Sequence, residues 1–257
     1  MNQSFRRIVF FLLVWVLATP ALAQRLTIAA AADLKFALAE VVEQFRATRP
    51  GARVEVVYGS SGKFYTQIRN GAPFDLYFSA DIQFPQKLEQ DGLTAGPPRQ
   101  FAIGRIVLWS LRPELGRMPL KDLARAPIRR FAIANPQHAP YGQRAREALE
   151  HQGVWAALEG KLVQGENIAH TAQFVDTGAA EAGIVALALV LAPTLQGKGV
   201  WTLIPEEWHA PLEQGYVITR RGANNPLARE FADYMASEPA RGIMRRYGFV
   251  LPGEGGR

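Results

Sequence analysis

The sequence predicts an α/β protein, because short apolar runs typical of buried strands alternate with segments whose apolar residues recur at helical spacing. Several of the strand-like runs end in a polar or glycine-rich turn just before a helix-like segment. The composition is that of a globular chain, with 48% hydrophobic and 20% charged residues among 257. Disordered and fibrous chains are therefore excluded.

The sequence of the N-terminal half predicts three strands, each followed by a helix. Residues 26–30 are a short apolar run, and Asp33 behind them is a residue type that favours a helix N-cap. Apolar residues then recur at helical spacing over 34–45, and 54–58 form the next strand-like run. After a turn at 59–62, we expect a helix at 64–70, a strand at 76–78 and a helix at 82–90.

The C-terminal half continues the alternation. Apolar four-residue runs predict strands, and amphipathic stretches predict helices. The expected strands are 106–109, 131–134, 183–186 and 216–218, and the expected helices are 144–151, 225–237 and 238–247.

Residues 1–23 have the features of a secretory signal peptide. Arg6 and Arg7 precede an uncharged apolar run at 8–18, and Ala21-Leu22-Ala23 supplies a small-x-small cleavage pattern. The run is shorter than the roughly 20 residues that a membrane-spanning helix needs. We therefore expect cleavage after Ala23.

The expected mature chain starts at Gln24. Because no cysteine stands at this position, we expect a periplasmic protein without a lipid anchor. Removal of two arginines and no acidic residue lowers the formal charge from +6 to +4. The remaining basic residues are scattered, so we expect no nucleic-acid partner.

The residues needed for common catalytic sites are missing from the sequence. There is no cysteine, and the four histidines form no His-Glu-x-x-His pair. No Gly-x-Ser-x-Gly elbow occurs. The segment 59–63 is not a phosphate loop, because two residues rather than four separate its glycines. We expect no enzyme, cofactor or metal ion; a secreted α/β enzyme acting on a small anion is the alternative from another class.

Two turns are candidate anion sites. Gly59-Ser60-Ser61-Gly62 offers hydroxyls and backbone N–H groups before a helix, although a plain turn has the same composition. The proline-rich segment 135–142 follows an expected strand and can aim the N–H of Tyr141 at a ligand, or serve as a rigid connector.

These segments resemble the periplasmic molybdate-binding proteins, the solute receptors of molybdate ABC transporters. The matching blocks occur in order along nearly all of the expected mature chain, and the block from Gly71 to Asp81 is the most specific. The blocks are 30–34, 59–62, 71–81, 135–142, 183–186 and 246–249.

The resemblance implies a two-lobed binding protein of class II with a hinge and two chain crossings. We place the crossings near 101–104 and 213–216. Lobe 1 is then 24–103 plus 216–257, and lobe 2 is 104–215. The implied function is capture of molybdate, and of tungstate, by a monomer that delivers it to a membrane permease.

The resemblance also implies a binding set. Ser61 matches the position of the ligand hydroxyl, and Tyr141 and Ile168 match positions that donate backbone N–H groups. Ala32, Ser60 and Ala186 are further candidates. Some family members carry a tyrosine where this chain has Ala186.

Asp33 departs from the family pattern, in which familiar members carry Ser or Asn. An ionised Asp is acceptor-only and repels a dianion. Three explanations are open: Asp33 caps its own helix while its N–H reaches the ligand, it is protonated in the complex, or the ligand is another anion such as sulfate, phosphate or a small organic acid. We favour the first, because Asp is common at N-caps.

Overall fold

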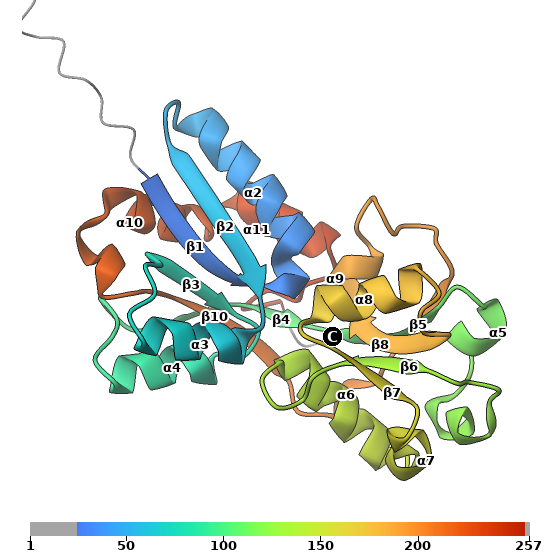
Figure 1. The fold of residues 1–257 in the computed structure, drawn as a ribbon. Helices are drawn as coiled ribbons and strands as arrows, with labels where there is room; N and C mark the ends of the chain where they lie inside the picture. The colour runs from blue at the N-terminus through green and yellow to red at the C-terminus, as the bar shows by residue number, and fades with distance from the viewer. Residues whose placement is uncertain (1–24, 255–257) are drawn as a thin grey trace, which may run out of the picture.

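The computed structural model describes residues 25–254 and contains two five-stranded mixed sheets with helices packed on them (Figure 1). The expected signal peptide and cleavage site lie outside the described residues. This architecture confirms the predicted α/β class. The strands are β1 Arg25–Ala31, β2 Arg53–Gly59, β3 Leu76–Ser79, β4 Arg99–Gly104, β5 Ile106–Ser110, β6 Phe131–Ala134, β7 Leu162–Gly165, β8 Ala182–Ala186, β9 Val200–Leu203 and β10 Leu212–Ile218.

The helices connect these strands. The α-helices are α2 Lys35–Thr48, α3 Ser61–Arg69, α4 Gln83–Gln90, α5 Pro113–Gly116, α6 Pro140–His151, α7 Trp155–Glu159, α8 Ile168–Asp176, α9 Leu187–Val190, α10 Pro226–Tyr234 and α11 Glu238–Arg246. The 3-10 helices are η1 Ala32–Leu34, η2 Leu120–Arg125, η3 Glu206–Trp208 and η4 Arg221–Asn224.

The first sheet has the strand order β2-β1-β3-β10-β4. Strands β1, β2 and β3 are parallel, and β10 runs antiparallel to β3 and β4. Leu26 and Ile28 of β1 pack in one core with α2, α10 and α11, whereas Ala29 packs in a second core with α3 and α4. This alternation buries both faces of the strand, which explains its unbroken apolar sequence.

The second sheet has the strand order β7-β6-β8-β5-β9. Strands β6, β7 and β8 are parallel, and β5 runs antiparallel to β8 and β9. Its core also includes Ala31 and Ala80 from the first lobe, so the two lobes pack against each other.

The chain crosses between the sheets twice. The first passage joins β4 to β5 through Arg105, next to the expected position. The second joins β9 to β10 over 204–211. The expected crossing at 213–216 was misplaced, because these residues already lie in β10 and pair with β3 and β4.

Several helix boundaries differ from the expectation. Helix α6 begins at Pro140 rather than 144, since proline is well suited to the first helical position. Helix α3 begins at Ser61 rather than 64. Strand β7 was not expected, because residues 162–165 are only partly buried and their apolar and polar side chains alternate weakly. Helix α8 was not expected either.

Candidate oxyanion site between the lobes

Helices α3, α6 and α8 begin at one small cavity between the lobes. Helix α3 belongs to the first lobe, and α6 and α8 belong to the second (Figure 1). The cavity has a volume of about 10 Å³. Its lining residues are Ala31, Ala32, Asp33, Gly59, Ser60, Ser61, Ala80, Ala139, Pro140, Tyr141, Asn167 and Ile168. The four main predicted site residues are therefore brought together.

Ser61 is held in place from two sides. Its Oγ accepts a hydrogen bond from the Ala80 N–H at 3.0 Å, and its carbonyl oxygen accepts one from the Tyr77 hydroxyl at 2.7 Å. Since Oγ is used there as an acceptor, its hydrogen remains available for a ligand. Ser61 also opens α3, and the first N–H groups of a helix have no partner within the helix.

Tyr141 and Ile168 occupy the first turns of α6 and α8. Pro140 takes the first position of α6, so the Tyr141 N–H follows it in the second. Asn167 caps α8, and its side chain accepts hydrogen bonds from the N–H groups of Ala169 and His170 at 3.0 Å each. The Ile168 N–H is not a target of that cap. Both main-chain donors therefore lie where helix dipoles favour an anion.

Asp33 does not cap a helix, so the explanation that we favoured from the sequence is wrong. Ala31 precedes η1 and Leu34 precedes α2, and neither helix start has a side-chain capping bond. The Oδ2 of Asp33 instead accepts hydrogen bonds from the Tyr141 hydroxyl at 3.1 Å and from Gln214 Nε2 at 2.6 Å.

Burial dominates the ionisation of Asp33. The side chain is 1% exposed, and desolvation raises its pKa to about 6. The hydrogen bonds from Gln214 and Tyr141 act in the opposite direction and lower the pKa, and the nearby backbone N–H groups of Asp33 and Leu34 lower it as well. Tyr141 is buried as well, and its own burial together with the nearby Asp33 charge raises the pKa of its hydroxyl well above the usual value.

The three lesser candidates have different surroundings. Ala32 lines the cavity. Ser60 also lines it, but its hydroxyl lies 2.8 Å from His138 Nδ1 and donates to the His138 carbonyl. Ala186 ends β8 and is not among the lining residues of the cavity in the described chain, so its place in the binding set stays a prediction. Because residue 186 is an alanine, this chain has no hydroxyl like that of the tyrosine expected at this position in some family members.

Interlobe contacts lie next to the cavity. The Gly62 N–H donates to the His138 carbonyl at 2.9 Å, and a Cβ at Gly62 would lie 2.7 Å from that oxygen. Sequence reasoning missed His138 and Gln214. The only sequence signal for His138 was its place in a proline-rich turn. The only signal for Gln214 was that it is a polar residue inside a strand-like run.

Two ion pairs also connect the lobes. Lys63 and Glu166 are 3.0 Å apart and exposed, whereas Arg144 and Asp81 are 3.7 Å apart and largely buried. Neither pair supplies a cation to the cavity. The lining residues in the described chain include no Lys, Arg or His, so an anion there is bound by neutral donors.

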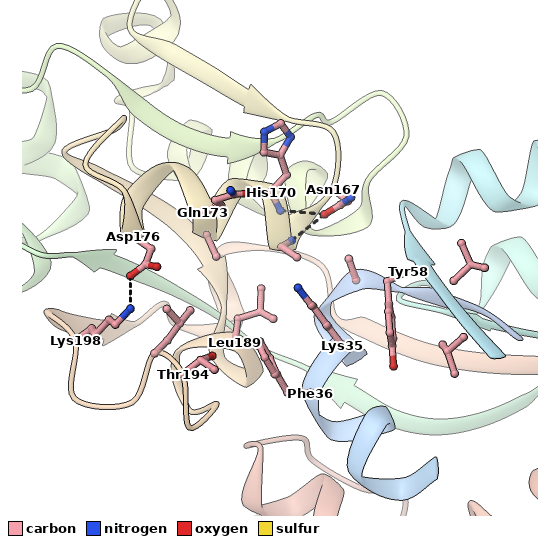
Figure 2. Close-up of a pocket in the computed structure, with 16 residues that line it drawn as sticks. Lys35, Phe36, Tyr58, Asn167, His170, Gln173, Asp176, Leu189, Thr194 and Lys198 are labelled. Atoms are coloured by element: carbon pink, nitrogen blue, oxygen red, sulfur yellow. Dashed lines mark hydrogen bonds and ion pairs between the residues drawn. The ribbon is translucent and has the colours of Figure 1, made fainter. Parts of the chain in front are cut away.

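A wider hollow of about 830 Å³ lies beside this cavity, between α2 and β2 on one side and α8 and α9 on the other (Figure 2). Figure 2 shows Lys35 extending from α2 into it. Lys198 and Asp176 at its far end pair with each other at 2.9 Å. The hollow is open and partly apolar. Its lining among the described residues includes the starts of α2 and α8 but not those of α3 and α6.

The described residues offer no site for a bound metal and no span for a membrane. No group of three or more His, Asp or Glu side chains could hold a metal ion within 25–254. Over the same residues, no helix is both long and apolar enough to cross a bilayer.

The two lobes and the anion-suited cavity between them define a binding protein. The family model of the bacterial extracellular solute-binding proteins matches residues 26–250, and the chain belongs to this family. The chain is 37% identical to the molybdate-binding protein ModA of Azotobacter vinelandii over 98% of its length and all of the relative's. It is 35% identical to ModA of Rhodobacter capsulatus, with 93% of each covered.

The fold resembles a solved structure as well. The Azotobacter vinelandii periplasmic molybdate-binding protein superimposes with a TM-score of 0.83 at 34% identity, covering 88% of this chain and 99% of that one. The predicted two-lobed architecture is thereby confirmed.

Proposed function

We propose that this chain is an extracytoplasmic receptor that binds molybdate, and also tungstate, between its lobes and delivers it to the permease of an ABC transporter. The observation that carries the proposal is the convergence of the α3, α6 and α8 starts on a cavity without basic side chains. A tetrahedral dianion is acceptor-only and matches such donors. The names of the two ModA relatives support molybdate as the anion.

The proposed binding set is the Ser61 hydroxyl and N–H, the Tyr141 and Ile168 N–H groups, and Asp33. The receptor works without catalysis or cofactor, as a monomeric periplasmic protein freed of residues 1–23. Closure of lobe 1 (25–104 and 212–254) on lobe 2 (105–211) buries the ligand, as hinge closure does in other periplasmic binding proteins.

Titration calorimetry of the ligand-stripped mature chain tests the proposal. Molybdate and tungstate are titrated separately, with sulfate and phosphate as shape-matched competitors. We expect tight binding of the first two and at least a hundredfold weaker binding of sulfate. Absence of heat and of a thermal shift with molybdate overturns the proposal.

A second candidate is a receptor for a different oxyanion, and Asp33 is the observation that favours it. A carboxylate in the cavity accepts a hydrogen bond from a ligand that keeps a proton, as hydrogen phosphate does. Binding of phosphate in preference to molybdate in the same titrations selects this candidate.

A further inference from the structure

Only one of the two oxygens of the Asp33 carboxyl receives hydrogen bonds from side chains. Both hydrogen bonds that it receives from side chains, from Tyr141 and Gln214, fall on Oδ2. Its Oδ1 is buried without a hydrogen-bond partner among the described residues. Buried polar atoms are nearly always paired, and Asp33 is one of the residues that line the cavity, so a ligand bound there is the candidate partner of this oxygen.

A molybdate dianion and a carboxylate cannot pair with each other directly, because both only accept hydrogen bonds. We propose that Asp33 is a ligand-binding residue that holds the oxyanion through one shared proton between Oδ1 and a ligand oxygen. The proton comes from solvent when the dianion binds and returns to solvent on release, and no other bond forms or breaks. This inference rests on the proposed function.

The surroundings of Asp33 favour a proton over a cation as the compensating charge. Among residues 25–254 no basic side chain lines the cavity, and desolvation already raises the pKa of the carboxyl to about 6. A nearby dianion raises it further. The complex then contains the neutral acid at neutral pH, and the Asp33 O–H serves as an additional donor.

Other groups around η1 are separable from Asp33 in a titration. The elements packed on it supply Lys35 from α2, Tyr58 from β2, His170 from α8 and Tyr141 from α6, with His138 next to Ser60. Burial raises the pKa of Tyr58 to about 12 and lowers the pKa of His138. Measurement at pH 8 lies above the range in which His138, with its lowered pKa, changes charge, and below the raised pKa of Tyr58.

The test is calorimetry with sodium molybdate at pH 8 in two buffers of different ionisation enthalpy. We expect uptake of about one proton per molybdate by the mature chain and none by Asp33→Asn, whose amide N–H replaces the acid O–H. From pH 7 to 9 the affinity of the parent chain falls about tenfold per pH unit, and that of Asp33→Asn stays level.

Asp75→Asn is the matched control. Asp75 is also a buried carboxylate of the first lobe, and it accepts from the Thr27 N–H at 2.9 Å outside the cavity. It should keep the proton uptake of the parent chain. Thermal unfolding confirms that both variants are folded.

The outcomes separate the two proposals. Tight molybdate binding by the parent chain without proton uptake overturns the shared proton and leaves the proposed receptor function intact. Failure of the folded parent chain and both variants to bind molybdate overturns the receptor function itself. Proton uptake that persists in Asp33→Asn assigns the proton to another group and also overturns the inference.

Discussion

Single side chains decide how the cavity presents its hydrogens. The Ala80 N–H occupies a lone pair of Ser61 Oγ and thereby orients the hydroxyl hydrogen away from it. The sequence predicted Ser61 correctly as a member of this cluster, because a serine at a helix start is a common anion donor. It could not predict the Ala80 contact, which joins residues 19 positions apart.

Ser61→Ala should weaken molybdate binding by about tenfold to a hundredfold, in line with 1.5–3 kcal/mol for a hydrogen bond to a charged group. It also leaves the buried Ala80 N–H unpaired, which costs stability. Calorimetry and thermal unfolding measure the two effects. Ser110→Ala is the control, because Ser110 is equally buried and bonds the Glu181 carbonyl away from the cavity. An unchanged affinity for Ser61→Ala would remove Ser61 from the binding set.

Asp33 should make the unliganded protein less stable as pH rises. Its pKa in the folded chain, about 6, exceeds the ordinary value of 3.8 for an aspartate, so the folded state holds the proton more tightly. Stability is therefore full below about pH 4 and is lost as pH rises to about 6, by up to about 3 kcal/mol. Asp33→Asn should raise the unfolding temperature at pH 7.5 but not at pH 4. Equal shifts at both pH values would contradict this pKa.

At the scale of elements, the start of α3 meets the second lobe at a glycine. The Gly62 N–H bonds the His138 carbonyl, and there is no room for a Cβ between them. The Gly-rich turn was predicted from the sequence as an anion site. Its second role as an interlobe contact depends on how the lobes pack, which no local pattern encodes.

Gly62→Ala should weaken molybdate binding at least tenfold, because the added Cβ opposes closure of the lobes. The unfolding temperature without ligand should change little, since alanine suits a helix. Gly242→Ala in α11 is the control, because nothing lies within 4 Å of its added Cβ. Titration calorimetry compares the variants, and a parent-like affinity for Gly62→Ala would argue against closure at this contact.

For the whole molecule, burial ranks the two ion pairs that bridge the lobes. The side chains of Lys63 and Glu166 are 44% and 59% exposed, whereas those of Arg144 and Asp81 are 10% and 15% exposed. Exposed pairs contribute less than about 1 kcal/mol and are screened by salt. Removal of one partner from a largely buried pair destabilises the protein more, because it leaves the other charge buried and unpaired.

Lys63→Ala should therefore change molybdate affinity less than fivefold, and Arg144→Ala should lower it by more than tenfold. Small-angle scattering of the molybdate-loaded proteins should show a larger radius of gyration for Arg144→Ala only. The opposite ranking would mean that the exposed pair governs closure.

The sequence by itself determined the α/β class and most of the strands and helices, and its resemblance to the molybdate-binding proteins implied the cluster of Ser61, Tyr141 and Ile168. Periodicity and turn chemistry are local properties, and the ordered motif blocks extend them along the chain. The tertiary structure alone decided the hydrogen-bond partners of Asp33 and the position of the second crossing. Asp33 meets Gln214 from 181 residues away, and β10 joins the first sheet by pairing with β3 and β4. Both depend on long-range contacts, which form only when the lobes are assembled.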